Sequence, residues 1–293
     1  MSGPAMLAHL LLEHLSPRKP LPREPEDGLI MDDLAQNEAF ELAGREDGIL
    51  AFIYLYQALQ IAPLVCPGDR VLDLGCGPAN QLVQIARLSP QARFIGLDAS
   101  PEMLARAQKT IQRCNVANVK TEAGDMTTLE GFADASFDCV ISTMSLHHLH
   151  DTVALDNTMR AVRRVLKPGG GLYLIDFGRL KHTSTQRFFA EDRSDIQPEK
   201  FTQDYFNSLR AAFSVKELSR AAQALGGNVR RYATALAPFM VIFKSATRRD
   251  PDAQTRQLAC ELYRQLSEQQ QEDFRLYARW LRASGLGLPF APY

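Results

Sequence analysis

Short aliphatic runs alternate with amphipathic segments through the middle of the chain. Five such runs predict buried strands, at residues 70–74, 93–98, 118–121, 137–142 and 172–176. The segments between them have the period of helices, and this alternation predicts a doubly wound parallel α/β sheet. Two further runs, 229–234 and 239–243, flank a turn at Pro238 and predict an antiparallel closing hairpin.

Helical patterns also precede this core. A leucine-rich helix is expected over Met6 to Leu15, and the ten residues from Ser16 to Pro25 contain four prolines, as in an extended connector. This arm is interpreted either as a loosely docked segment or as a flap over a ligand site or a dimer contact. Asp32 and Asp33 precede a helix that runs to about Leu42. A second helix is expected over 46–61, with Asp47 near its start.

The chain therefore divides into three expected parts: an arm with cap helices at 1–64, a core at 65–245 and a helical extension at 246–293. Within the core, the polar stretch at 179–213 interrupts the alternation and is expected to form a wall of the acceptor pocket. The extension is expected to contain two charged amphipathic helices between 251 and 283. These helices suit either packing on the sheet or a homodimer interface.

Composition narrows the class of protein. The 293 residues include 33 Lys and Arg against 34 Asp and Glu, a net charge of -1 that gives no reason to expect a nucleic-acid partner. The five cysteines include no C-x-x-C pair, which favours a reducing, cytoplasmic setting. No apolar run reaches the ~18 residues of a membrane span, and Met1 to Leu15 lacks the basic start of a signal peptide.

A glycine turn follows the first predicted strand, in the stretch Asp73-Leu74-Gly75-Cys76-Gly77-Pro78. Glycine lets the backbone approach a ligand, and the helix that follows directs free N–H groups into the loop. Asp98 ends the second strand about 20 residues later, where dinucleotide-type folds place the acid that accepts from ribose hydroxyls. A glycine turn alone is weak evidence, but the pair indicates a nucleoside site.

Five stretches together resemble the ordered motifs of class I S-adenosylmethionine-dependent methyltransferases: 73–78, 96–104, 124–126, 137–138 and 164–170. Within that family, the order of elements is similar to the quinone-biosynthesis C-methyltransferases. The resemblance implies a Rossmann-like, mostly parallel seven-stranded sheet with an antiparallel last strand. It also implies S-adenosyl-L-methionine as cofactor, S-adenosyl-L-homocysteine as product and a small-molecule acceptor. The family often has a third glycine where Ala79 stands, and little loss is expected from this change.

The resemblance also implies roles at the methionine end of the cofactor. Asp73 would order the loop and lie near the cofactor amine, while Gly75 and Gly77 would admit the methionine part. Cys76 lies within the same loop and is expected to be a small filler. Thr143, just after the fourth strand, would contact the methionine part.

At the nucleoside end, Asp98 would accept hydrogen bonds from both ribose hydroxyls, since a carboxylate has two oxygens. Ala99 and Met103 would flank the adenine ring. In the stretch Gly124-Asp125-Met126, the carboxylate would accept from the adenine amino group while the methionine packs on the ring. For Asp125 an ordinary turn is the alternative.

Methyl transfer from a sulfonium mainly requires alignment, so a catalytic triad is not expected. If the acceptor is a hydroxyl or a carbon acid, candidate bases are His148, Tyr54 and Asp176. His147 and His148 belong to a histidine-rich run whose imidazoles are too closely spaced to converge from one regular element, and no metal is expected. Either histidine is a proton acceptor or orienting group, or both pack in the loop. Arg179 would pair with an anionic acceptor or be solvated.

Four other functional hypotheses are alternatives to a small-molecule methyltransferase. A non-catalytic, cofactor-binding partner of a complex would bind the cofactor without turnover. An arsenic methyltransferase would need several cysteines at the acceptor site, whereas Cys139 is expected in a strand and Cys114 at a helix end. A nucleic-acid methyltransferase would need a base-flipping motif, which is absent from the sequence. A dehydrogenase would leave the stretches 124–126 and 137–145 unexplained.

Overall fold

A seven-stranded sheet forms the centre of the protein in the computed structural model, which describes residues 3–26, 34–45 and 47–293. The strand order is β3-β2-β1-β4-β5-β7-β6. The strands are β1 Arg70–Leu74, β2 Arg93–Asp98, β3 Val119–Ala123, β4 Phe137–Thr143, β5 Leu166–Phe177, β6 Val229–Ala233 and β7 Met240–Ser245. The first five are parallel, and β7 runs antiparallel to both β5 and β6. The predicted fold class and closing hairpin are confirmed.

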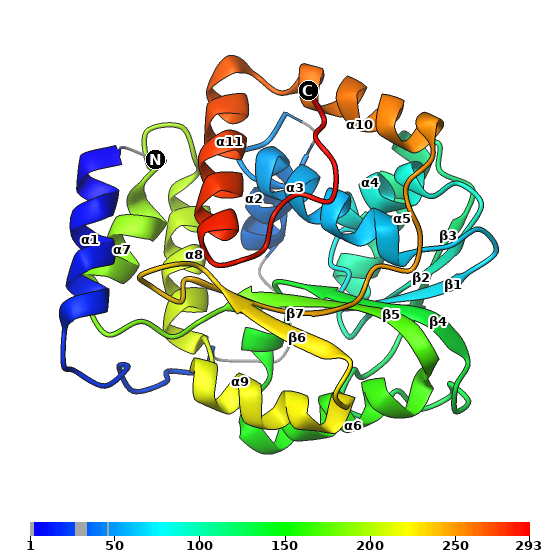
Figure 1. Ribbon diagram of the computed structural model, residues 1–293, viewed down its shortest axis with the longest axis horizontal. Helices are drawn as coiled ribbons and strands as arrows, with labels where there is room; N and C mark the ends of the chain where they lie inside the picture. Colours follow the sequence, from blue (N-terminus) through cyan, green and yellow to red (C-terminus); the bar gives the residue numbers. More distant parts are fainter. Residues whose placement is uncertain (1–2, 27–33, 46) are drawn as a thin grey trace.

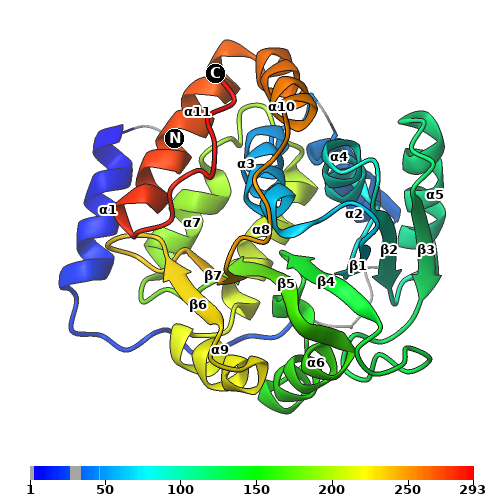
Figure 2. The ribbon, with the colours of Figure 1, turned by 45° about the vertical axis from the view of Figure 1, so that its right-hand side comes forward.

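Helices cover both faces of the sheet (Figures 1 and 2). One face carries α3 Ala51–Ile61, α4 Asn80–Leu88, α5 Pro101–Arg113, α10 Ala253–Gln265 and α11 Glu268–Ala283; the other carries α6 Thr152–Val165 and α9 Val215–Ala221. Side chains alternate along a strand, so Val71 joins the first core while Leu72 and Leu74 join the second. The central strands are therefore buried on both faces, and the helices pack over them.

Local capping chemistry explains where the central helices begin. The Ser100 hydroxyl accepts from the Met103 backbone N–H at 3.2 Å, and Pro101 occupies the first helical position of α5. Asp151 starts α6 in the same way, since one carboxylate oxygen accepts from the backbone N–H groups of Val153 at 2.9 Å and Ala154 at 2.8 Å. These caps fix the helices that run back from the carboxyl ends of β2 and β4.

The structure corrects three element predictions. Helix α3 begins at Ala51 rather than at 46, and Asp47 lies in a turn without capping the helix. Strand β5 begins at Leu166 rather than at 172, and its pairing with β4 contains a register shift. The polar stretch 179–213 contains α7 Thr183–Glu191 and α8 Glu199–Ala211. The expected helix start at Asp32 and Asp33 lies outside the described residues.

The terminal additions pack against the core. Helix α1 Gly3–Leu15 lies along α7, and α2 Leu34–Ala43 contacts α8. Helices α10 and α11 contact α3, so the C-terminal extension packs on the helices that cover one face of the sheet (Figure 1). Side chains from α1, α3 and α11 share one hydrophobic cluster, among them Leu10, Leu55 and Tyr277. Of the helices that the structure describes, none is both long and apolar enough to span a bilayer.

Candidate active site

The carboxyl ends of β1, β2 and β4 meet where the strand order reverses between β1 and β4, the usual ligand position in such sheets. A hollow, here called the loop hollow, opens there. It is lined by Phe40, Tyr54, Asp73, Gly75, Cys76, Gly77, Pro78, Asn80, Gln81, Asp98, Ala99, Ser100, Met103, Met126, Thr143, Met144, Ser145 and His148. Nearly all of the predicted cofactor residues are thus brought together, while Gly124 and Asp125 lie outside this lining.

Asp73 is the most deeply buried carboxyl group in the lining of the loop hollow. Its side chain is 3% exposed, and its Oδ1 atom has no hydrogen-bond partner among the described residues. Burial, with Asp98 nearby, raises the pKa of this carboxyl well above its usual value. A buried acceptor without a donor is costly, and a cationic donor such as an ammonium group would satisfy it. The site therefore fits a ligand with an amino-acid end.

Asp98 joins the two loops that form the rim. Its Oδ2 accepts from the Gly77 backbone N–H at 2.8 Å and its Oδ1 from the Ser100 backbone N–H at 2.9 Å. Burial raises the pKa of Asp98, and these hydrogen bonds oppose the rise. Each oxygen keeps a further lone pair, so the carboxylate can accept from two hydroxyls of a ribose. Ser100, rather than Asp98, caps α5.

Glycine is present at the two loop positions for different structural reasons. Gly77 has φ +51°, and a Cβ there would have only Phe40 Cε1 near it, at 3.7 Å, so this position opens toward the hollow. Gly75 has φ +66°, but a Cβ there would lie 2.5 Å from Ser145 Cβ, so the protein's own packing requires this glycine. Ala79 also has a positive φ, 59°, which costs about 1–2 kcal/mol that glycine would avoid.

Two further residues of the predicted cofactor site, Cys76 and Asp125, make contacts within the protein. A Cβ at Gly96 would lie 2.8 Å from Cys76 Sγ, so this thiol fills the space beside β2. The Asp125 carboxylate accepts from the Thr127 backbone N–H and hydroxyl, both at 2.7 Å. The structure thus contains the turn that was the alternative for Asp125, and its contact with adenine stays a prediction.

A second hollow, here called the aromatic hollow, adjoins the first. It is lined by Glu26, Phe40, Leu50, Ile53, Tyr54, Thr143, Met144, His147, His148, Phe177, Phe201, Asp204, Tyr205, Ser208 and Met240. Five side chains line both hollows: Phe40, Tyr54, Thr143, Met144 and His148. Molecules bound in the two hollows would therefore lie next to each other, with His148 at their boundary.

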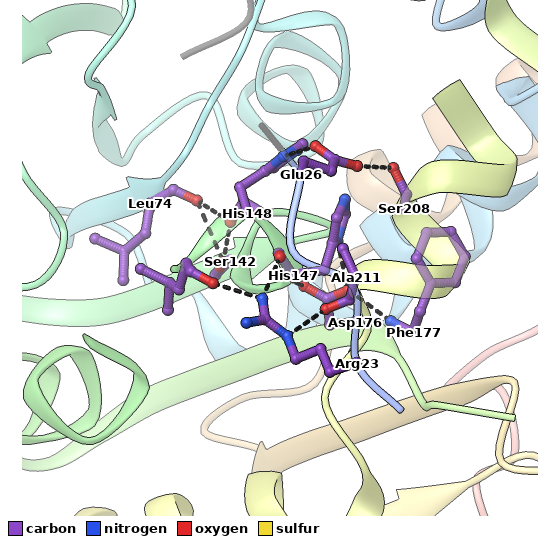
Figure 3. Close-up of polar contacts among 12 residues, drawn as sticks. Arg23, Glu26, Leu74, Ser142, His147, His148, Asp176, Phe177, Ser208 and Ala211 are labelled. Carbon is purple, nitrogen blue, oxygen red and sulfur yellow. Dashed lines mark hydrogen bonds and ion pairs between the residues drawn. The ribbon is translucent and has the colours of Figure 1, made fainter. Parts of the chain in front are cut away.

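His148 is held by a residue of the N-terminal arm (Figure 3). Its Nδ1 lies 2.7 Å from Glu26 Oε2, and the Ser208 hydroxyl donates to Glu26 Oε1 at 2.9 Å. Burial would raise the pKa of Glu26, but the hydrogen bond and charge of His148 outweigh it and lower this pKa to about 2. An ionised carboxylate only accepts, so Nδ1 carries a proton, and Nε2 has a free lone pair whenever the ring is neutral. Nothing in the sequence motifs indicated Glu26.

His147 is enclosed by Asp176 (Figure 3). Its Nδ1–H donates to Asp176 Oδ1 at 2.7 Å and its backbone N–H to Oδ2 at 2.9 Å. Burial lowers the pKa of His147, but Asp176 more than offsets this, so the net shift is upward. Asp176 also accepts from the Phe177 backbone N–H at 2.6 Å and lines neither hollow. Asp176 is therefore a positioning group, and the structure does not place this candidate base at the reacting position.

The proline-rich arm crosses this loop instead of docking loosely. Arg23 donates from Nε to the carbonyl oxygen of Ala211 at 2.6 Å. Its terminal nitrogens donate to His147 O at 2.9 Å and to Leu149 O and His150 O at 2.5 Å each. The guanidinium also lies 3.9 Å above the ring centre of Phe213. The interpretation of the arm as a cover over the ligand site thus agrees with its position.

The structure changes the expected roles of two more side chains. Burial, with Asp73 nearby, raises the pKa of Tyr54, so this hydroxyl is better suited to donate a hydrogen bond than to act as a base. Arg179 forms an ion pair with Glu217 at 2.5 Å and is 10% exposed, so the solvated position expected for it is wrong. Its contact with an anionic acceptor stays a prediction.

The expectation about histidine geometry also needs correction. The short 3-10 turn Leu146–His148 brings the rings of His147 and His148 to a centroid distance of 4.2 Å. Together with Glu26 they offer three ligand atoms within 4.8 Å of one another, so close spacing does not prevent convergence. Both Nδ1 atoms are engaged by carboxylates, and the site holds these imidazoles as a hydrogen-bonded group.

Comparison with known proteins agrees with this geometry. A family model described as "Methyltransferase domain" matches residues 66–222, more than half of the chain. A demethylmenaquinone methyltransferase of a Mycobacterium species is 32% identical over 166 residues, covering 57% of this chain and 57% of that protein. A trans-aconitate 2-methyltransferase of Deinococcus radiodurans is 38% identical over 106 residues, covering 36% of this chain and 37% of that protein.

A quinone C-methyltransferase of Teredinibacter turnerae, named for ubiquinone and menaquinone biosynthesis, is 30% identical over 127 residues, covering 43% of this chain and 49% of that protein. The chain thus spans between about a third and just over half of the length of these relatives. Among solved structures, a SAM-dependent methyltransferase from Aquifex aeolicus superposes with a TM-score of 0.52 at 17% identity, covering 73% of this chain and 98% of that one. This likeness bears on the fold alone.

The strand order and the position of the loop hollow define a Rossmann-like domain with a hollow at the carboxyl ends of β1, β2 and β4. With the family match over residues 66–222, the chain belongs to the methyltransferase domain family.

Proposed function

We propose that this protein transfers a methyl group from S-adenosyl-L-methionine to a small molecule that carries an acidic hydroxyl or carbon. The observation that supports this most is the shared wall of the two hollows, since five side chains border both. One hollow suits the cofactor and the other suits an acceptor, and they meet at His148. Such a juxtaposition is what an in-line displacement needs.

The chain's own residues would hold the cofactor at both ends. Asp73 offers a buried carboxylate to the amine, and Asp98 offers two oxygens to the ribose. When bound, the cofactor supplies an activated methyl group on a sulfonium. Holding the acceptor in line with that methyl can lower the barrier by roughly 7–11 kcal/mol.

His148 is proposed as the proton acceptor for the acceptor's hydroxyl or carbon. Glu26 keeps the proton on Nδ1, which leaves the Nε2 lone pair as the base. This is the arrangement of an oriented general base, which typically contributes about 10²–10⁴-fold to a rate. Tyr54, whose hydroxyl stays protonated, is proposed to orient an oxygen of either ligand.

Two variants test the two halves of the proposal. For Asp98→Ala we expect at least a tenfold weaker S-adenosylhomocysteine affinity by calorimetry, about 1.4 kcal/mol. For His148→Gln we expect unchanged affinity for that product but a loss of about 100-fold in turnover, measured as S-adenosylhomocysteine formed with a panel of phenols and 1,3-diketones. Asp195→Ala, at an exposed position, is the matched control.

Unchanged product affinity in Asp98→Ala would refute the ribose assignment. Product binding with no turnover over the whole panel in the wild type would instead favour the non-catalytic partner role. The cytoplasmic setting and the homodimer stay proposals as well. Exposed leucines on α1, including Leu11 and Leu15, provide an apolar surface where a Leu11→Gln variant would test self-association by light scattering.

A further inference from the structure

A third hollow, here called the inner chamber, lies directly beside the aromatic hollow. Leu50, Ile53, Phe201 and Tyr205 line both. Among the other residues that bound the chamber, Phe52 belongs to α3, Phe189 to α7 and Tyr277 to α11. The C-terminal extension, packed on α3, therefore completes a cavity that opens off the acceptor site.

Tyr277 on α11 gives the inner chamber an unused donor. Its side chain is 1% exposed, and its hydroxyl has no hydrogen-bond partner among the described residues. Buried hydroxyls in proteins are nearly always paired, so this one calls for a partner that the chain itself does not provide. Tyr277 lines the chamber, and a ligand oxygen there could accept from the hydroxyl.

The rest of the wall indicates what kind of ligand fits. Phe189 and Phe239 stack at 4.1 Å between ring centroids, and Phe52 and Tyr205 add further aromatic surface. The charged members of the wall are engaged with one another, because Arg193 pairs with both Asp273 and Asp192. A charged ligand would have to displace one of these pairs at a large desolvation cost, whereas an uncharged, apolar one would not.

We propose that the inner chamber binds the part of the acceptor remote from the methylated atom, and that the acceptor is an uncharged, elongated, mainly apolar molecule with a carbonyl or ether oxygen at its far end. The reacting end lies by His148, the apolar body passes Ile53 and Tyr205, and the far oxygen accepts from the Tyr277 hydroxyl. This inference rests on the proposed function, since it assigns the aromatic hollow to the acceptor. It gives the C-terminal extension a role in specificity.

Two series of probes test it. The first consists of phenols with para alkyl chains of about one to eight carbons, and the second of the same chains ending in a methyl ketone. Binding to the full chain loaded with S-adenosylhomocysteine is measured by calorimetry. We expect the affinity to rise about threefold to fourfold per methylene once the chain reaches the inner chamber. We expect the ketone series to bind more tightly than the alkyl series at the lengths that reach Tyr277.

Two variants then separate the features. Tyr277→Phe should weaken the long ketones about five- to tenfold and leave the alkyl series unchanged. Ile49→Trp, at a position that lines only the inner chamber, should abolish the gain with chain length and leave 4-methylphenol unaffected. Ile49→Phe provides a milder filling variant if the larger one unfolds, and thermal melting checks both.

Affinity that is flat with chain length, or an equal ketone preference in wild type and Tyr277→Phe, would overturn the inference. Turnover is read separately as S-adenosylhomocysteine formed from the short phenols. Chain-length-dependent binding without turnover would leave the inner chamber supported and count against the proposed reaction. Turnover of short phenols with no effect of chain length would support the proposed reaction and count against binding in the inner chamber.

Discussion

The substitution Arg23→Ala tests whether the N-terminal arm is part of the site. Arg23 donates to four backbone carbonyl oxygens, those of Ala211, His147, Leu149 and His150, and its guanidinium lies over Phe213. A net hydrogen bond from a charged donor is worth about 1.5–3 kcal/mol, although bonds from one group do not add. Alanine also leaves partly buried carbonyl groups without their donor.

The expected loss is therefore about 2–4 kcal/mol in the free energy of unfolding, a large effect for one surface segment. It should be measured by urea denaturation with and without S-adenosylhomocysteine. Arg18→Ala, in the same arm but exposed, is the control and should change stability by no more than about 0.5 kcal/mol.

The same substitution should reduce turnover, because Glu26 lies three residues further along the arm and holds His148. Product affinity should change little, since Arg23 lines neither hollow. A loss below about 1 kcal/mol with full turnover would mean that the arm only rests on the surface, and the argument for a built-in cover would fail.

Three further substitutions test groups with shifted pKa values. The pKa of Glu26 in the folded protein is about 2, below its ordinary 4.5. The ionised carboxylate therefore stabilises the folded protein above pH 4.5, and this stabilisation is lost as the pH falls toward 2. In acid denaturation, Glu26→Gln should lower the free energy of unfolding by up to about 3 kcal/mol at pH 5, and by less at pH 2. The pKa of Asp73 is raised by burial, so wild-type affinity for S-adenosylhomocysteine should fall as the pH is lowered, and should do so at a higher pH than an ordinary carboxyl would titrate. Asp73→Asn should bind weakly and without this dependence in calorimetry. Burial lowers the pKa of Lys244 to about 8 from 10.5, so the unfolded chain holds this proton more tightly between these values and wild-type stability should rise with pH across that window. Lys244→Met should remove this rise and stabilise the protein at pH 7 by about 1–2 kcal/mol. Removing the buried charge gains about 3 kcal/mol, but the Gln60 oxygen loses its hydrogen-bond donor, which offsets part of the gain. A destabilised variant whose stability has the same pH dependence as the wild type would show that burial of the lysine does not destabilise the protein.

Local patterns were sufficient to predict the sheet and most of the residues that line the loop hollow. Strand composition, the Ser100 cap and the Gly-x-Gly turn are encoded within a few residues, and Asp98 lies at the end of a strand that the same patterns define. These features need no knowledge of distant contacts, and the structure confirms the predicted sheet.

Predictions that depended on distant contacts succeeded less well. Glu26 meets His148 across 122 residues of sequence, and Arg179 meets Glu217 across 38, so no local pattern could pair them. Gly75 looked like a ligand-approach glycine, but Ser145, from the loop after β4, is what requires it. The two helices within 179–213 were missed, and their side chains Phe189, Phe201 and Tyr205 line the aromatic hollow or the inner chamber.

The division of labour within the chain follows from these contacts. The sheet provides fixed carboxylates at its strand ends, which suits a cofactor whose shape does not vary. The proposed acceptor side adds segments outside the sheet to the strand ends: Glu26 from the arm, Phe201 and Tyr205 from the insert and Tyr277 from the C-terminal extension. Loops and additions can change without disturbing a packed core. Acceptor choice in this protein is therefore expected to reside in residues 16–26, 183–211 and 268–283, and substitutions there should alter acceptor affinity while leaving product affinity intact.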